Sequence, residues 1–275
     1  MTDPTAAPAT GLVPGPAWLF CPADRPERYA KAAAAADVVI LDLEDAVSPG
    51  DKAAARQALI DNPQDPARTV VRVNAVGTPE HALDLEMLAA TDYSHVMLAK
   101  AESAEQVAAL APHRVIALIE TPLGAVRAHE IAAERSTAGL MWGAEDLVAG
   151  LGGSSSRGAD GSYRPVAQHV RSSVLLAAKA FGKTALDAVH LDIKDLAGQR
   201  AEALDAVSTG FDASVCIHPS QVAEVRAAYR PADEEIDRAR RVLAAAEGQR
   251  GVFSFEGTMV DSPVLRHAES VLRRA

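Results

Sequence analysis

The sequence predicts an α/β fold: a (β/α)8 barrel followed by a C-terminal helical extension. Strand-like apolar runs alternate with helix-like segments along most of the chain, and several of the runs end in charged residues. Continuous Val, Ile and Leu runs are typical of parallel strands buried on both faces. Charges placed where strands pass into loops indicate a site at the C-terminal rim of a barrel.

The expected strands are short apolar runs, each followed by a helical pattern rich in alanine. The strands are expected over residues 18–22, 38–43, 69–74, 95–100, 115–120, 139–143, 186–191 and 213–218. The helices are expected over residues 27–36, 51–60, 79–90, 104–111, 124–134, 164–182, 196–209 and 220–229. Such alternation favours a parallel sheet with helices outside it.

Two details refine this prediction. A Gly/Ser-rich loop over residues 149–162 precedes the longest helix, whose apolar stripe contains Val166, Val170, Val174, Ala177 and Phe181. An open doubly wound sheet is the alternative fold. It usually carries a glycine fingerprint after its first strand, whereas residues 22–28 read PADRPER.

The chain is expected to divide into three parts. Residues 1–16 are expected to form a flexible tail, because they are rich in Pro, Ala, Thr and Gly and lack the features of a signal peptide. Residues 17–231 contain the barrel pattern. Residues 232–275 contain an amphipathic helix with Ile236, Ala239, Leu243 and Ala246 aligned, a short irregular or hairpin segment and a terminal helix. This extension is expected to pack on its own subunit or to reach a neighbouring one.

The composition of the chain excludes several classes of partner and scaffold. The chain has 275 residues, a formal net charge of −10 and two cysteines, Cys21 and Cys216. The negative charge argues against nucleic-acid and membrane partners, because it provides no basic field to attract phosphates. The count of two excludes a disulfide scaffold and favours buried free thiols in a cytoplasmic protein.

Carboxylates and an arginine carry the chemistry. Glu120 and Asp146 end the fifth and sixth expected strands, so their side chains could converge on one cation. With oxygen ligands alone, Mg²⁺ or Mn²⁺ is favoured over Zn²⁺. The alternatives are helix-dipole compensation for Asp146 and an arginine partner for Glu120. Arg72 could bind a substrate carboxylate or oxyanion, or could pair with Asp42 or Glu44.

The remaining charges near the rim have plainer alternatives. Asp42 and Glu44 should point to one side and Asp45 to the other. The structural alternative for these three carboxylates is that they cap the next helix and pair with Lys52 or Arg56. Lys100 ends the fourth strand, where a solvated lysine is the simpler interpretation. A basic cluster of Arg25, Arg28 and Lys31 could neutralise phosphates or form a solvated helix face.

At these residues the chain resembles the CitE-like branch of the HpcH/HpaI aldolase superfamily, which contains the citrate lyase β-subunit and stand-alone malyl-CoA and citramalyl-CoA lyases. The resemblance covers about residues 17–270. It rests on ordered motifs: LFCPADRPERYAKA (19–32), VILDLEDAV (39–47), VRVN (71–74), LIET (118–121), GAEDL (143–147), CIHPSQ (216–221) and GTMVDSP (257–263). One departure is LAK at 98–100, where relatives often have LPK.

The resemblance implies a TIM barrel with a C-terminal extension, built as a homotrimer or hexamer. It implies that Glu120 and Asp146 bind Mg²⁺, with Mn²⁺ as the alternative, and that Arg72 and Glu120 bind the acid portion of the substrate. Glu44 is implied as an acidic residue near the metal, and Asp261 as an aspartate delivered from a neighbouring subunit. The implied CoA-binding residues are Pro22, Arg25, Arg28, Lys31, Ile217, His218 and Pro219.

The activity implied is Mg²⁺-dependent cleavage or formation of a carbon–carbon bond in a short β-hydroxyacyl-CoA. Malyl-CoA or citramalyl-CoA would give acetyl-CoA and a 2-oxo acid, and attack by water would make the same site a thioesterase. Two alternatives stand beside this expectation. One is a CoA-independent class II pyruvate aldolase, and the other is a subunit that works in, or scaffolds, an acyl-carrier citrate lyase complex.

Overall fold

The computed structural model describes residues 15–249 and 251–275, so residues 1–14 of the expected N-terminal tail lie outside the described part. The chain divides into two compact units, one ending at Val225 and the other covering Arg226–Ala275. None of the described helices is long and apolar enough to cross a bilayer.

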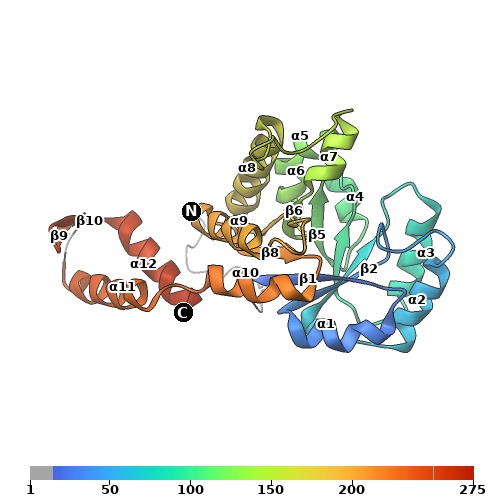
Figure 1. Cartoon of the computed structure of the whole chain (residues 1–275), viewed down its shortest axis with the longest axis horizontal. Helices are drawn as coiled ribbons and strands as arrows, with labels where there is room; N and C mark the ends of the chain where they lie inside the picture. The colour runs from blue at the N-terminus through green and yellow to red at the C-terminus, as the bar shows by residue number, and fades with distance from the viewer. Residues whose placement is uncertain (1–14, 250) are drawn as a thin grey trace. The chain divides into compact units, whose positions relative to one another are not determined.

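The first unit is a closed barrel of parallel strands in the order β1 to β8, with β1 pairing with β8 (Figure 1). This confirms the predicted barrel and excludes the open sheet. The strands are β1 Ala17–Pro22, β2 Val38–Asp42, β3 Thr69–Val73, β4 His95–Leu98, β5 Arg114–Ile119, β6 Thr137–Trp142, β7 Thr184–Asp187 and β8 Ala213–Cys216.

Helices connect the strands and lie outside the barrel (Figure 1). They are α1 Tyr29–Ala35, α2 Lys52–Asp61, α3 Pro79–Leu88, α4 Ala104–Ala108, α5 Pro122–Val126, α6 Ala128–Ala133, α7 Ala144–Gly150, α8 Pro165–Ala180, α9 Leu196–Thr209 and α10 Val222–Tyr229. Short 3-10 turns are η1 Pro26–Arg28, η2 Pro66–Arg68 and η3 Pro219–Gln221.

Apolar side chains from every strand fill the barrel interior. Ile40, Val70, Met97 and Leu186 are completely buried there, together with the indole of Trp18. Truncating one such aliphatic side chain to alanine costs about 2–5 kcal/mol of stability. Cys21 and Cys216 are both buried and form no disulfide, as predicted. This packed interior closes the floor below the C-terminal strand ends.

The structure corrects three local predictions. The helix expected over 124–134 is broken at Arg127 into α5 and α6. The seventh strand ends at Asp187 instead of residue 191, since the carboxylate of Asp187 is held by Trp142 and Arg171 and the chain then leaves the sheet. The stripe of α8 is shorter than expected, because Val166 and Phe181, near its two ends, are exposed.

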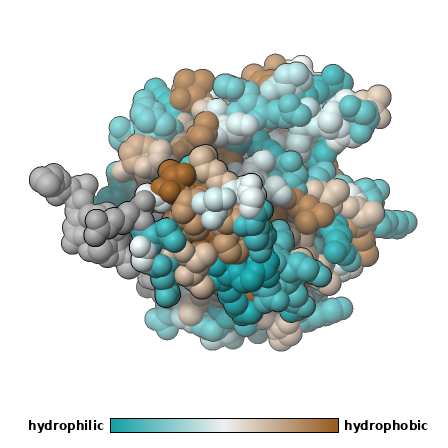
Figure 2. Space-filling model, turned by 90° about the vertical axis from the view of Figure 1, so that its left-hand side faces the viewer, coloured by the Kyte–Doolittle hydropathy of each residue, from teal (hydrophilic) through white to brown (hydrophobic). Residues whose placement is uncertain are grey.

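The second unit contains α11 Asp233–Ala246, the hairpin strands β9 Phe253–Phe255 and β10 Thr258–Val260, and α12 Ser262–Arg274. Its core is formed by Ile236, Ala239, Val242, Val260, Ala268 and Val271. Val242 is more buried than the predicted Leu243, which packs at the edge of this core. Figure 2 shows one face of the molecule in space-filling form, where hydrophobic residues (brown) gather beside hydrophilic ones (teal).

Candidate active site

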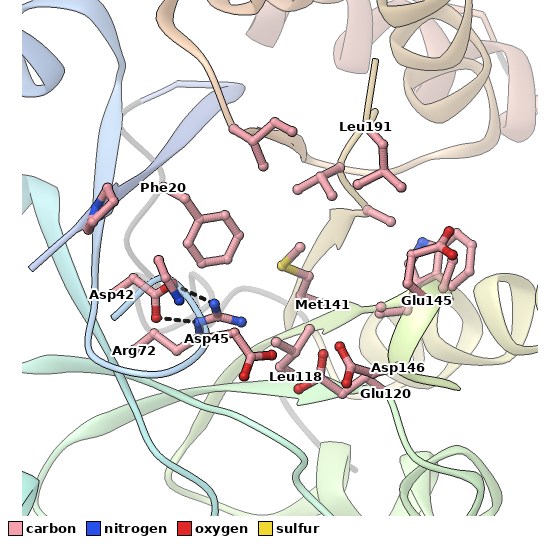
Figure 3. Close-up of a pocket in the computed structure, with 18 residues that line it drawn as sticks. Phe20, Asp42, Asp45, Arg72, Leu118, Glu120, Met141, Glu145, Asp146 and Leu191 are labelled. Carbon is pink, nitrogen blue, oxygen red and sulfur yellow. Dashed lines mark hydrogen bonds and ion pairs between the residues drawn. The ribbon is translucent and has the colours of Figure 1, made fainter. Parts of the chain in front are cut away.

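The C-terminal ends of the barrel strands surround a cavity of about 320 Å³ (Figure 3). Its apolar lining residues include Phe20, Leu118, Met141, Val189 and Leu191. Its charged lining residues include Asp42, Asp45, Arg72, Glu120 and Asp146. A small, largely apolar pocket with a few converging charges is the usual form of a site for a small organic acid.

Arg72 lies at the end of β3 and is held by two carboxylates of the β2 end. Its Nε donates to Asp42 Oδ1 at 2.7 Å and its Nη2 to Asp42 Oδ2 at 2.5 Å. Its Nη1 lies 3.1 Å from Glu44 Oε2, and the guanidinium stacks 4.6 Å from the centre of the Phe20 ring. Burial alone would lower the pKa of Arg72, but Asp42 and Glu44 outweigh burial and raise it. The arginine is therefore a fixed cation.

Arg72 pairs with Asp42 and Glu44, as the structural alternative for this arginine expected, whereas Lys52 and Arg56 do not pair with the β2 carboxylates. Lys52 donates to the backbone carbonyls of Leu43 and Glu44 and to Asn74 Oδ1, not to a carboxylate of the cluster. Arg56 pairs with Glu80 and Asp84 on α3. The proposed pairing of the β2 carboxylates with Lys52 or Arg56 was wrong, because those cations bind groups on the loops and on α3.

Glu120 directly follows β5, and Asp146 lies in the first turn of α7, so the two strand ends bring their carboxylates side by side (Figure 3). Glu120 is 4% exposed, whereas the Asp146 side chain is 42% exposed. Burial raises the pKa of Glu120 to about 8, although Lys100 and Arg72 act against burial. A buried carboxylate with such a raised pKa is short of positive charge.

Gly143 makes room for Glu120. A Cβ at this position would lie 2.8 Å from Glu120 Oε2 and 2.9 Å from Glu120 Cβ. A larger residue would therefore displace the carboxylate. The neighbouring Glu145 is directed elsewhere, because its Oε1 accepts a 2.6 Å hydrogen bond from the Ser156 hydroxyl. Only Asp146 of this acidic dipeptide lies beside Glu120 in Figure 3.

Lys100 lies among these carboxylates and is not the solvated lysine of the simpler interpretation. Its ammonium donates to Glu44 Oε1 at 2.5 Å and lies 3.6 Å from Asp146 Oδ1 and 3.9 Å from Glu120 Oε1. Burial alone would lower the pKa of Lys100, but the bond to Glu44 and the nearby carboxylates raise it. The space beside Glu120 and Asp146 therefore attracts positive charge.

The donor set suits a divalent cation that binds oxygen. Within residues 15–249 and 251–275, no group of three or more His, Cys, Asp or Glu side chains is arranged to hold a metal. Two carboxylates and an open cavity are thus what the barrel offers to an ion. Mg²⁺ accepts one or two carboxylates and fills its other positions with water or substrate oxygens, whereas zinc sites usually need more protein ligands.

The expected CoA-binding residues have different positions. Pro22 and Ile217 line the cavity. Arg25, Arg28 and Lys31 are exposed on the segment that follows β1. The arginines lie 3.9 Å from their sequence neighbours Asp24 and Glu27, a distance typical of weak surface pairs that leave the cations accessible.

His218 and Pro219 follow β8, and the His218 side chain accepts a hydrogen bond from the Ser220 backbone N–H. Asp261 belongs to the second unit. It is the N-cap of α12, where its Oδ1 accepts from the Val264 backbone N–H at 3.4 Å.

The sequence did not reveal which apolar residues line the cavity. Phe20 and Met141 were counted only as strand residues, and Val189 and Leu191 were placed inside a strand instead of on the cavity wall. The alternation of side chains along each strand could have indicated which apolar residues face inward. It could not have indicated that the chain leaves the sheet after Asp187.

Comparison with known proteins extends these observations. The model of the HpcH/HpaI aldolase/citrate lyase family matches residues 17–219. A citrate lyase subunit beta-like protein of Mycobacterium tuberculosis is 68% identical over 261 residues, which cover 95% of this chain and 96% of the relative. A (3S)-malyl-CoA thioesterase of Cereibacter sphaeroides is 35% identical over 274 residues, covering 94% of this chain and 93% of the relative.

A solved structure of similar sequence gives the same fold. It is the crystal structure of the protein CitE from Mycobacterium tuberculosis in complex with magnesium, acetoacetate and coenzyme A. The two chains are 67% identical with a TM-score of 0.92, and the match covers 96% of this chain and 99% of the other. By sequence and by fold, this chain belongs to the HpcH/HpaI aldolase/citrate lyase family.

Proposed function

We propose that this protein is a Mg²⁺-dependent lyase that cleaves, or in reverse forms, a carbon–carbon bond in a short β-hydroxyacyl-CoA. The substrates proposed are malyl-CoA and citramalyl-CoA, and the products are acetyl-CoA and a 2-oxo acid. The observation that carries the proposal is the pair Glu120 and Asp146 beside Arg72 in one small cavity. The names and ligands of the relatives support it.

Glu120 and Asp146 are the proposed metal ligands. Both side chains line the cavity, and burial raises the pKa of Glu120, which favours a nearby cation; these two observations support the assignment. When bound, Mg²⁺ supplies positive charge that stabilises negative charge developing on substrate oxygens. Glu44 is proposed to support the metal site without binding the metal. It accepts a hydrogen bond from Lys100 and pairs with Arg72, and so holds both cations near Glu120 and Asp146.

Arg72 is the proposed binding group for the acid portion of the substrate. A guanidinium has five N–H donors. Asp42 accepts from two of them, on Nε and Nη2, and Nη1 forms an ion pair with Glu44 at 3.1 Å. One hydrogen on each terminal nitrogen is left for a ligand. Two parallel donors match a carboxylate, so Arg72 can orient the acid and stabilise an oxyanion without moving.

The cleavage needs one proton removed and one proton supplied. Loss of the β-hydroxyl proton allows the Cα–Cβ electron pair to leave as the enolate of acetyl-CoA, while the hydroxyl carbon becomes the carbonyl of the 2-oxo acid. Protonation of the enolate carbon then completes acetyl-CoA. Asp261 of a neighbouring subunit is the proposed acid and base for these steps, which requires the homotrimer or hexamer implied by the family resemblance.

The CoA portion is proposed to lie along the rim between β1 and β8. Pro22 and Ile217 form the cavity side of this path, with His218 and Pro219 beside Ile217. The exposed cations Arg25, Arg28 and Lys31 are proposed to contact the nucleotide phosphates. Residues 17–231 would then supply the metal, acid and CoA sites, and residues 232–275 the closing aspartate.

The test is product analysis with the purified chain and (S)-malyl-CoA or (S)-citramalyl-CoA, in Mg²⁺ and in EDTA. We expect acetyl-CoA with glyoxylate or pyruvate in Mg²⁺ and no products in EDTA. Free CoA with malate or citramalate would instead identify a thioesterase, the activity for which one relative is named. Turnover in EDTA equal to that in Mg²⁺ would contradict the proposal.

A further inference from the structure

Lys100 has a backbone conformation that is rare for a lysine. Its φ is +51°, in the left-handed region that residues with a Cβ seldom adopt. Such conformations persist where the surrounding structure imposes them, and they cluster at functional sites. Here the turn directs the Lys100 backbone N–H to Glu120 Oε1 at 3.0 Å. The residue thus contacts the proposed metal site through its main chain as well as its side chain.

The Lys100 ammonium is shared unequally among carboxylates. Its short hydrogen bond goes to Glu44 at 2.5 Å, while Asp146 and Glu120 lie at 3.6 and 3.9 Å. At the longer distances the ammonium balances charge without a direct hydrogen bond. The oxygens of Glu120 and Asp146 therefore remain available to another cation while their charges are partly neutralised.

Arg72, which lines the cavity, cannot replace Lys100. The Nε and Nη2 atoms of Arg72 donate hydrogen bonds to Asp42, which is buried beside it. Its remaining contact in this cluster is with Glu44. Asp45 adds a further carboxylate 3.6 Å from the Lys100 ammonium. The positive charge nearest to both Glu120 and Asp146 is thus that of Lys100.

We propose that Lys100 is a positioning residue that serves as a resident counter-cation for Glu120 and Asp146 and competes with the incoming metal. It holds the two carboxylates together before Mg²⁺ binds. Once Mg²⁺ is bound, two cations share the same carboxylates, and their repulsion weakens the metal complex. The inference rests on the proposed function only in taking Glu120 and Asp146 as the metal-binding pair.

The competition predicts two effects of opposite sign for Lys100→Met. Without metal, the variant should unfold at a temperature lower by roughly 4–8 °C, because buried carboxylates lose their counter-charge. Titrated at a pH high enough to keep Glu120 and Asp146 ionised in both proteins, its Mg²⁺ affinity should rise by about tenfold, because the competing charge is gone. A lysine that merely supports the fold would lower both quantities.

The experiment is calorimetric titration of the metal-free full-length protein with MgCl2, together with thermal unfolding in EDTA and in saturating Mg²⁺. Lys100→Arg keeps the charge and should retain the wild-type affinity. The matched control is Lys179→Met on α8, which removes a lysine whose Nζ bonds Asp212 at 2.6 Å. It should leave Mg²⁺ affinity unchanged.

The outcomes separate this inference from the proposed function. Tighter Mg²⁺ binding with a lower metal-free unfolding temperature supports the counter-cation role. Unchanged or weaker binding by Lys100→Met overturns it while leaving the metal site intact. If wild type shows no Mg²⁺ binding that Glu120→Gln removes, the metal pair itself fails. Should Lys100→Met not fold, Lys100→Gln, which keeps a donor for Glu44 but no charge, is measured in the same way.

Discussion

The two charged edges of the cavity differ in how completely their charges are balanced. At the β2–β3 edge, Arg72 is fixed by Asp42 and Glu44 in short contacts. At the β5–β6 edge, Glu120 and Asp146 share one ammonium at 3.6–3.9 Å. The first edge is complete in the protein alone, whereas the second is short of positive charge. This difference indicates which part of the cavity orients a ligand and which part needs a metal.

Removing a carboxylate from the β5–β6 edge, which is short of positive charge, should have the largest effect on activity. Asp146→Ala should lower Mg²⁺-dependent turnover by about a thousandfold or more, since Mg²⁺ would lose one of two protein ligands. The fold should survive, because the Asp146 side chain is 42% exposed. Steady-state kinetics and circular dichroism measure the two effects. Glu145→Gln is the neighbouring control and should retain activity within a few fold.

Removing Arg72 from the β2–β3 edge, where the charges are balanced, should lower the stability of the protein. Arg72→Met leaves Asp42, which is 1% exposed, without its cation. Removing one partner of a buried pair costs about 3–5 kcal/mol. Urea unfolding without metal should show this loss for Arg72→Met but not for Asp146→Ala. Equal losses of stability in the two variants would erase the proposed distinction between the edges.

The pH dependence of metal binding should identify Glu120 as the group that must lose a proton. Burial raises its pKa to about 8 from an ordinary value of 4.5. Its contribution to metal-free stability is therefore full below about pH 4.5 and is lost as the pH rises through 8.

Because Mg²⁺ binds the deprotonated carboxylate, Mg²⁺ affinity should rise by about tenfold per pH unit between pH 6 and pH 8. The increase in unfolding temperature on adding Mg²⁺ should grow over the same range. Thermal unfolding with and without Mg²⁺ at several pH values measures it. A stabilisation that stays constant from pH 6 to pH 8 would argue against this role of Glu120.

The smallest change is Gly143→Ala, which tests the close approach at the incomplete edge. The added methyl group would meet Glu120 Oε2 at 2.8 Å and shift the carboxylate. We expect Mg²⁺ affinity to fall by about tenfold while the Arg72 edge keeps its stability. Titration calorimetry gives the affinity. Gly152→Ala is not a suitable control, because Gly152 has a positive φ. Gly50→Ala meets no neighbouring atom and is the better one.

Much of this arrangement could be predicted from the sequence. Continuous apolar runs and regular alternation predicted the barrel, and the positions of Arg72, Glu120 and Asp146 at strand ends predicted that they meet. Strand ends were less certain, because Asp187 ends β7 through contacts with Trp142 and Arg171 that lie far away in the sequence.

The role of Lys100 could not be predicted for the same reason. Its carboxylate partners come from three other strand ends, and its left-handed backbone has no signature in the sequence around it. The pairing of Lys52 with carbonyls and Asn74, instead of with the β2 carboxylates, likewise depends on the positions of β2 and β3. Local pattern locates such residues, whereas the fold selects their partners.

The most direct test of the difference between the two edges is a crystal of the protein grown with Mn²⁺ and a 2-oxo acid. Mn²⁺ prefers the same oxygen ligands as Mg²⁺ and gives an anomalous signal that locates it. We expect a single strong peak within bonding distance of Glu120 and Asp146, with the acid's carboxylate on Arg72. A peak elsewhere in the barrel, or an ordered acid with no ion at these carboxylates, would contradict it.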